Sequence, residues 1–198
     1  MSMLVGGVSD KLGNGYEAQW TLLEALNVLQ ARADEIRTEP FNEHAAGLEF
    51  RVNANGRKYW HQCKRRVASG SWTMRALDSE GVLRAFAGKL IDPSNNCVFV
   101  SSDPAASLKS LVEKARLAES AVSYLEGISG SDRRERKVLL ESWAIDPDTE
   151  LDWLKRCRVE IVSEDTMNQQ FESRASLLFE ADVAVARMRD ELNQYERL

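Results

Sequence analysis

Apolar residues recur at helical spacing near the start of the chain. The repeat lies within residues 16–37 and comprises Leu22, Leu23, Leu26, Leu29 and Ala33. Because side chains three and four positions apart share one face of a helix, the pattern predicts a helix over 16–37. Pro40 follows, and the residue before a proline is pushed out of the helical conformation. We therefore expect the helix to end before Glu39-Pro40-Phe41 and a short strand to begin there.

Two alternating segments, residues 48–54 and 57–64, flank the dipeptide Asn55-Gly56. Asn-Gly is typical of a two-residue hairpin turn, because both residues tolerate a positive φ. Such a turn places Ala54 opposite Arg57 and fixes the register of the whole ladder. The sequence therefore predicts a β-hairpin over residues 48–64.

The predicted register gathers three polar side chains on one face of the hairpin. Glu49 faces Gln62 directly, with Cβ atoms about 5 Å apart, and Lys64 reaches the same point from a diagonal position about 7–8 Å away. The other face is expected to pack against a helix. It is largely apolar and carries Leu48, Phe50, Val52, Tyr59, His61 and Cys63. We interpret His61 as a core histidine rather than a catalytic base.

The next part of the chain alternates helical and extended patterns. Residues 73–91 predict a helix, and residues 97–100 an apolar strand. Residues 104–156 predict helices that are interrupted near 127–131 and at 146–147, where glycine, serine and proline break the periodicity.

Residues 159–162 predict a further strand, and a final helix is expected from residue 164 to the end. That helix carries a heptad-like apolar seam of Leu178, Ala181, Val185, Met188, Leu192 and Tyr195. The seam either packs on the protein's own core, which is commoner, or pairs with a partner. The whole order predicts a single α/β domain over 1–198 with a mixed sheet of four or five strands. Its core spans about 12–103 and a helical extension about 104–198.

Composition narrows the class of protein. Hydrophobic residues make up 43% and charged residues 29% of the 198 residues, as in soluble globular proteins. No apolar run approaches the roughly 18 residues of a membrane span, and the N-terminus shows no secretory signal. We expect a cytoplasmic protein without a membrane partner. The cysteines are too scattered for a disulfide framework or a zinc cluster and should be reduced: Cys63, Cys97 and Cys157.

The formal net charge of −5 hides an uneven distribution. Seven basic residues and no acidic residue lie between Arg51 and Leu77, whereas residues 159–198 hold nine acidic and four basic residues. Tyr59, Trp60 and Trp72 are interleaved with the basic residues. A solvated charge run is one interpretation, and a surface that binds nucleic-acid phosphates is the other.

The three converging side chains suit metal-assisted phosphodiester hydrolysis. A carboxylate and an amide oxygen, from Glu49 and Gln62, can share a hard divalent cation such as Mg²⁺. Lys64 can orient or deprotonate the attacking water and offset charge on the phosphate. The competing interpretation is a surface ion pair between Glu49 and Lys64, which contributes little energy.

A resemblance distinguishes between these interpretations. Residues 15–19 (GYEAQ), 47–50 (GLEF) and 60–65 (WHQCKR) resemble the double-stranded DNA endonuclease domain at the N-terminus of bacterial antiphage effectors. These effectors include CBASS proteins with a SAVED sensor and AVAST-type STAND NTPases. The family is a branch of the PD-(D/E)xK superfamily in which Gln-x-Lys often replaces Glu-x-Lys. The resemblance is close over the first helix and the hairpin and loose from Trp72 onwards.

Carried over residue by residue, the resemblance implies that Glu49 is the acidic metal ligand, Gln62 the second metal position and Lys64 the catalytic lysine. It makes Glu17 a further metal ligand or a water-positioning residue. The chain departs from the parent motif twice, with glutamate for aspartate and no acid in the Gln-x-Lys pair, which lowers the charge available to a metal. Phosphate contacts are expected from basic residues near the hairpin: Lys58, Arg65, Arg66 and Arg75.

The expected function is cleavage of double-stranded DNA with Mg²⁺ or Mn²⁺ by a restriction-endonuclease-like core. The resemblance further implies a homo-oligomer, because cutting both strands needs two sites, and a sensor or NTPase region in a longer protein. Two alternatives stay open. One is a DNA-binding or oligomerisation module whose nuclease site has degraded, and the other is an adaptor that recruits partners through its last helix.

Overall fold

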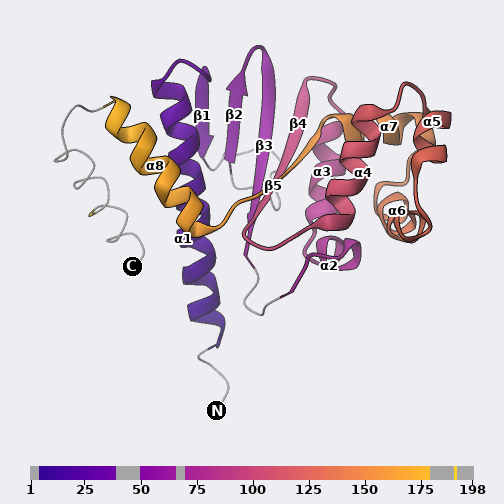
Figure 1. Ribbon diagram of the computed structural model, residues 1–198, viewed down its shortest axis with the longest axis horizontal. Coiled ribbons are helices and arrows are strands. Elements are labelled where there is room, and N and C mark those ends of the chain that lie inside the picture. Colours follow the sequence, from indigo (N-terminus) through magenta and orange to yellow (C-terminus); the bar gives the residue numbers. More distant parts are fainter. Residues whose placement is uncertain (1–4, 39–49, 66–69, 179–189, 191–198) are drawn as a thin grey trace.

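The computed structural model describes residues 5–38, 50–65, 70–178 and 190 (Figure 1). A five-stranded sheet organises them, and its strands lie in chain order. They are β1 (Glu35–Thr38), β2 (Phe50–Ala54), β3 (Arg57–Lys64), β4 (Asn95–Ser101) and β5 (Cys157–Ile161). The first three pair antiparallel, and β3, β4 and β5 pair in parallel. The predicted α/β class and mixed sheet of four or five strands are confirmed.

The hairpin between β2 and β3 turns at Asn55-Gly56. Asn55 has φ 52° and Gly56 φ 72°, the pair of positive values that a type I′ turn requires. Ala54 faces Arg57, and the same register continues to Phe50 opposite His61. The predicted hairpin and its register are therefore confirmed over the residues that the structure describes.

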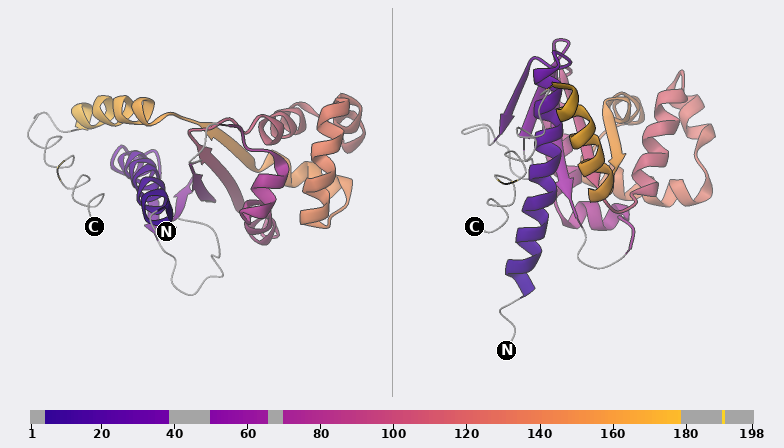
Figure 2. Two further views of the ribbon diagram at one scale, coloured as in Figure 1. Left: turned by 90° about the horizontal axis from the view of Figure 1, so that it is seen from below. Right: turned by 60° about the vertical axis from the view of Figure 1, so that its left-hand side comes forward.

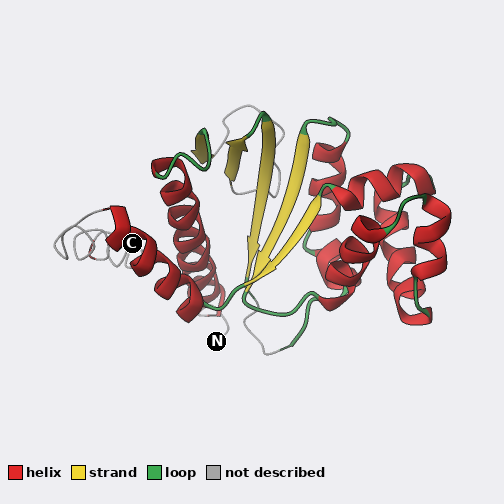
Figure 3. Cartoon of the chain, turned by 45° about the horizontal axis from the view of Figure 1, so that its top comes forward, coloured by secondary structure: helices red, strands yellow, loops and turns green. Residues whose placement is uncertain are grey.

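Helices cover both faces of the sheet (Figure 2). One face carries α1 (Val5–Leu29) and α8 (Glu164–Leu178). The other carries α2 (Met74–Ser79), α3 (Val82–Leu90) and α4 (Ala106–Leu117), with α5 (Ala121–Gly127), α6 (Gly130–Trp143) and α7 (Pro147–Lys155) packed beyond them (Figure 3). The sheet thus separates two apolar clusters.

Alternation along the strands assigns side chains to these clusters. Phe50, Val52, Cys63, Val98 and Val100 pack with the apolar residues of α1 and α8. The cluster on the opposite face includes Trp60, Cys97 and Phe99 with apolar residues of α2 to α7. Because neighbours in a strand point to opposite faces, even positions of β3 face α2 to α4, and odd positions face α1 and α8.

The prediction of a helix over residues 16–37 is wrong at both ends. The helix α1 starts at Val5, so four glycines lie within it, and it ends at Leu29. Ala31 then adopts φ 55°, a left-handed conformation that terminates helices. Residues 35–38 form β1 instead, paired with β2 from Glu35 opposite Asn53 to Thr38 opposite Phe50. The expected strand at 39–41 lies outside the described residues.

The helix predicted over residues 73–91 is divided in two. Gly81, with φ 76°, separates α2 from α3, because glycine adopts this conformation without the strain that a Cβ introduces. The expected interruptions near 127–131 and at 146–147 are both present. A further break falls between Leu117 and Ala121, where Ser120 caps α5 through a capping box.

A buried ion pair holds the helical extension together. Glu150 of α7 is fully buried and forms a bidentate pair with Arg136 of α6, with Nε–Oε1 at 2.8 Å and Nη2–Oε2 at 2.6 Å. The Tyr124 hydroxyl of α5 donates to the same carboxylate at 3.1 Å. Three helices therefore meet at one charged group, whose desolvation these contacts offset.

The strand predicted over residues 159–162 is observed as β5, two residues earlier. It returns the chain to the sheet beside β4, with Cys97 opposite Cys157. The helix expected from residue 164 is α8, described to Leu178, and the seam beyond Leu178 lies outside the described residues. No helix in the described residues is long and apolar enough to cross a membrane.

Candidate active site at the end of the hairpin

The candidate site lies near the carboxyl end of β3. Parallel pairing places Gln62 beside Phe99 and Lys64 beside Ser101 of β4. These residues share the sheet face that α2 to α4 cover, because Trp60 and Phe99 belong to that cluster. The carboxyl ends of parallel strands are the usual location of binding sites in open α/β sheets.

Two of the three residues that the motif predicts lie in described parts of the chain. Gln62 is fully buried, with no exposed surface, and Lys64 is half-buried at the last position of β3. The structure therefore brings these two side chains to the boundary between the core and the solvent. A low dielectric there strengthens any charge interaction that Lys64 makes.

Glu49 lies outside the described residues, so its pairing with Gln62 stays a prediction. The prediction rests on the register of β2 and β3. Phe50 pairs with His61 in the described ladder, and the same register would place the preceding residue, Glu49, opposite Gln62.

The structure adds polar groups that the motif did not predict. Ser101 is fully buried, and its hydroxyl accepts hydrogen bonds from Trp72 Nε1 at 2.8 Å and from the Asp103 backbone N–H at 3.0 Å. Asp103 also accepts a hydrogen bond from the Ser102 hydroxyl at 3.1 Å. The sequence signal for these polar groups is the Ser-Ser-Asp tripeptide directly after an apolar strand. A carboxylate thus lies two residues beyond the partner of Lys64.

Glu17 is half-buried on α1, the helix on the opposite face of the sheet from Gln62. The neighbouring Tyr16 shows where this turn of α1 lies along the strands, because its hydroxyl donates to the Val162 carbonyl, just beyond β5, at 2.8 Å. Burial raises the pKa of Tyr16, and nearby Cys63 and Asp103 raise it further. Glu17 therefore lies near the level of the carboxyl end of β3, where the Val162 N–H donates to the Ser101 carbonyl.

His61 lies in the core, as predicted. It is buried, stacks on Phe50 with ring centroids 4.6 Å apart, and accepts a hydrogen bond at Nδ1 from Trp20 Nε1 at 3.0 Å. Burial, with the nearby Arg158 charge, lowers the pKa of His61 from 6.5 to about 3. The imidazole is therefore neutral at physiological pH, on the face away from Lys64.

The basic residues expected to contact phosphates are spread over the molecule. Arg65 forms an ion pair with Glu164 at the start of α8, and Arg75 is exposed on α2. Lys58 lies at the hairpin end of β3, about 20 Å from Lys64 at 3.3 Å per residue. Arg66 lies outside the described residues. The structure therefore does not gather the described three into one patch.

Arg51 belongs to the basic stretch but not to its surface. Its side chain is buried, lies 3.5 Å from Glu35 in an ion pair, and sits over the Trp60 ring at 5.5 Å from the centroid. Its role is structural, because a buried and paired guanidinium cannot meet a phosphate. Sequence counting alone could not separate it from the exposed basic residues.

The metal site predicted at Glu49, Gln62 and Glu17 cannot be assembled from described residues alone. Within 5–38, 50–65 and 70–178, no three His, Cys, Asp or Glu side chains lie close enough to hold a metal ion. Gln62 and Glu17 offer the oxygen donors that Mg²⁺ and Mn²⁺ prefer. The oxygen donors of Gln62 and Glu17 therefore fit Mg²⁺ or Mn²⁺. The predicted metal site also needs the carboxylate of Glu49, which lies outside the described residues.

Comparison with solved structures finds a similar fold in a longer protein. The chain superposes on the Acinetobacter baumannii Cap4 SAVED/CARF-domain containing receptor with a TM-score of 0.52 and 14% identity, covering 93% of this chain and 41% of that one. The same receptor with the cyclic trinucleotide 2'3'3'-cAAA also gives a TM-score of 0.52, with 40% of that chain covered. The chain thus spans about two fifths of the receptor's length. No protein-family model and no curated protein matches the sequence.

Proposed function

We propose that this chain is a metal-dependent endonuclease domain that cleaves double-stranded DNA, as the effector part of a bacterial antiphage system. The observation that carries the proposal is the register of the hairpin, because the expected pairing of Glu49 with Gln62 follows from this register. The sheet adds Lys64 at the carboxyl end of β3, on the same face as Gln62. A mixed sheet with helices on both faces is compatible with a restriction-endonuclease-like core.

The defence context rests on two independent likenesses. The sequence motifs resemble endonuclease domains that accompany SAVED sensors, and the structural neighbour is a SAVED/CARF-domain containing receptor. Because this chain spans 41% of that neighbour, we propose that it works beside a sensor or NTPase region of a longer protein. Cutting both strands requires two sites, so the active form is a homo-oligomer.

The chemistry follows from the residue types. When bound, Mg²⁺ or Mn²⁺ would polarise the scissile phosphate and lower the pKa of a coordinated water. Glu49 and Gln62 would hold the ion, and Glu17 would complete its ligands or position a water. Lys64 would orient the attacking water and offset negative charge at the phosphate, as electrostatic preorganisation requires. Arg75 and Arg66 would hold the DNA backbone.

The uncharged Gln62 makes a specific demand on metal binding. Replacing a carboxylate by an amide removes one negative charge from the site, and the DNA phosphate can supply it instead. Mn²⁺ binding, followed by electron paramagnetic resonance, should therefore strengthen when duplex DNA is added. The Gln62→Glu variant should bind Mn²⁺ more tightly without DNA, and an unchanged affinity in that variant would argue against Gln62 as a ligand.

Cleavage itself is tested with supercoiled plasmid and Mg²⁺ or Mn²⁺. Wild type should cut, and the variants Lys64→Ala and Glu49→Ala should lose activity while keeping the wild-type unfolding transition. Equal activity in all three proteins, whether present or absent, would sink the catalytic claim.

The second candidate function is a DNA-binding or oligomerisation module whose metal chemistry is lost. It is favoured by the missing acid in the Gln-x-Lys pair. This alternative predicts DNA retardation with a steep salt dependence and no cleavage.

A further inference from the structure

A groove begins on the sheet face that carries α1 and α8, opposite Gln62, and continues to the β5 edge of the sheet, where residues of α4 and α7 line it. It consists of two adjoining hollows of about 480 and 650 Å³. Tyr59, Arg158 and Glu160 line both of them. The two hollows therefore form one concave surface, and their volumes are in the range of small-molecule sites.

The outer hollow is strongly cationic. Its lining gathers five basic side chains from β3, α4, α7 and β5: Arg57, Arg116, Lys155, Arg156 and Arg158. Glu160 is the acidic residue that accompanies them. In a chain with a net charge of −5, this concentration of positive charge attracts anions.

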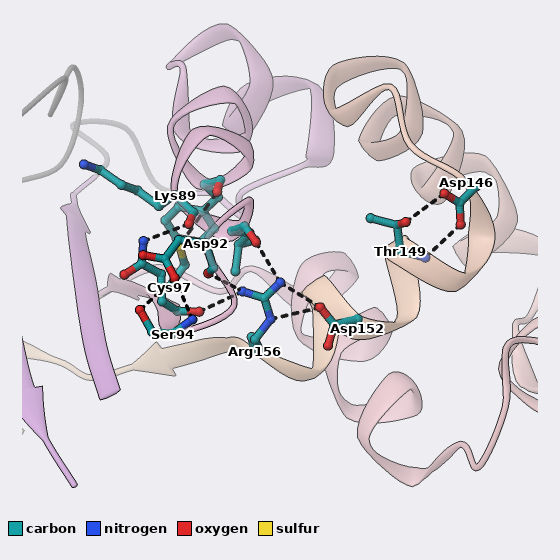
Figure 4. Close-up of polar contacts among 11 residues, drawn as sticks. Lys89, Asp92, Ser94, Cys97, Asp146, Thr149, Asp152 and Arg156 are labelled. Atoms are coloured by element: carbon teal, nitrogen blue, oxygen red, sulfur yellow. Dashed lines mark hydrogen bonds and ion pairs between the residues drawn. The ribbon is translucent and has the colours of Figure 1, made fainter. Parts of the chain in front are cut away.

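Two of these cations serve the fold. The Arg156 guanidinium donates to Asp152 Oδ2 and to the backbone carbonyls of Leu90, Asp92 and Asn95, at 2.7 to 3.0 Å (Figure 4). Arg116 donates to the Cys157 carbonyl. These contacts tie α3, α4, α7 and β5 together and make a rigid wall for the hollow.

The other three cations have no such role. Within the part of the chain that the structure describes, the side chains of Arg57, Lys155 and Arg158 form no hydrogen bond and no ion pair, and Arg158 lies over the Tyr59 ring at 5.2 Å. Arg51 and Arg65, by contrast, each have a carboxylate partner. The unpaired charges therefore converge on one hollow.

The inner hollow has a different lining. Apolar side chains of Trp20, Val52 and Val98 form part of its wall. Polar groups enter from α1 and β3, where Asn27 Nδ2 donates to Glu24 at 3.0 Å and His61 uses Nδ1 for Trp20. His61 lines this hollow, and Nε2 is the ring nitrogen that the bond from Trp20 does not use. Charged side chains also line this hollow, among them Glu24, Arg32 and Arg174. Apolar side chains next to hydrogen-bonding groups of both charges suit a planar moiety with a polar edge.

We propose that the groove binds a nucleotide, with the base in the inner hollow and the phosphates against Arg57, Lys155 and Arg158. The assignment does not depend on the nuclease proposal, because no residue of the groove belongs to that site. Phosphate oxygens match guanidinium and ammonium donors, and such charge-assisted contacts are the strong ones.

A DNA duplex fits this groove less well than a small ligand. The inner hollow lies between α1, α8 and the hairpin and has a volume of about 480 Å³, which is the size of a small-molecule site. Arg57 lies at the hairpin end of β3, about 20 Å from Lys64 along the strand, and Arg158 lies level with His61, about 10 Å from the level of Lys64. Both are at positions that face away from the side of the sheet on which Lys64 lies. Phosphates held here are therefore not those presented to Lys64.

The test uses the whole chain with ATP, GTP, AMP and pyrophosphate as probes, and adenosine as the uncharged control. At about 1 mM, at least one phosphorylated probe should raise the melting temperature, because a ligand that binds the folded state stabilises it. Calorimetry should then show a Kd at least tenfold weaker for Arg158→Ala and for Arg57→Ala, since each loses a charged hydrogen bond. Both positions are on the surface, so these variants should fold.

The matched control is Arg84→Ala, which removes an exposed arginine from α3 on the other side of the sheet. It should leave the Kd unchanged. The proposal is overturned if no phosphorylated probe binds, or if Arg84→Ala weakens binding as much as Arg158→Ala does. It is equally overturned if the groove variants weaken binding of duplex DNA while nucleotides have no effect, since the groove would then be a nucleic-acid surface.

Discussion

The buried His61 should make the stability of the fold depend on pH. Its pKa is lowered from 6.5 to about 3, first by burial and then by the Arg158 charge. Below pH 6.5 the unfolded chain binds a proton that the folded chain does not bind, so stability falls as the pH is lowered toward 3 and is fully present above 6.5. The loss is about 1.4 kcal/mol per pH unit, which amounts to about 2 kcal/mol between pH 7.5 and pH 5.

Urea unfolding at pH 7.5 and pH 5, followed by tryptophan fluorescence, measures this loss. The control is His61→Gln, whose side-chain oxygen can still accept from Trp20 Nε1 but which does not ionise. Whatever its absolute stability, this variant should lose about 2 kcal/mol less than wild type between the two pH values. An equal loss in both proteins would show that the imidazole is not held neutral in the core.

Three further predictions concern the fold. Glu150→Ala should lower the free energy of unfolding by about 3 kcal/mol in urea, because it removes the buried carboxylate that pairs with the half-buried Arg136 and accepts from Tyr124. Gly56→Ala should destabilise the fold by about 1 kcal/mol, since Gly56 has φ 72°, and a stabilising effect would refute the turn assignment. Gly88→Ala in α3, where an added Cβ meets no atom within 4 Å, should stabilise the fold by about 1 kcal/mol. Cys97 and Cys157, both buried with raised pKa values, should react with a thiol reagent at pH 8 only on unfolding, and rapid labelling of the folded protein would contradict their burial.

Local signals predicted the hairpin in detail. Asn55-Gly56 defines both the turn and the register, and strict alternation places His61 in the core and Gln62 on the other face. Such features depend on neighbours within a few residues. They can therefore be inferred from a single sequence.

Features that depend on distant partners were missed or misassigned. β1 is short and half exposed, so its pairing with β2 leaves no clear apolar pattern. Ser101 meets Lys64 only through the parallel pairing of β3 with β4. The ion pair of Arg65 with Glu164 of α8 joins residues that are remote in sequence, and no local pattern predicts it. The early start of α1 also overrides the low helix propensity of its glycines.

The central claim is that Lys64 belongs to a metal-dependent nuclease site. The direct measurement is the single-turnover rate of plasmid cleavage with Mn²⁺, compared between Lys64→Ala and Lys109→Ala, which removes an exposed lysine of α4. We predict that Lys64→Ala lowers the rate on the order of 100-fold or more, as removal of a group that stabilises the transition state does, whereas Lys109→Ala cuts as fast as wild type. Equal rates in the two variants would contradict the account.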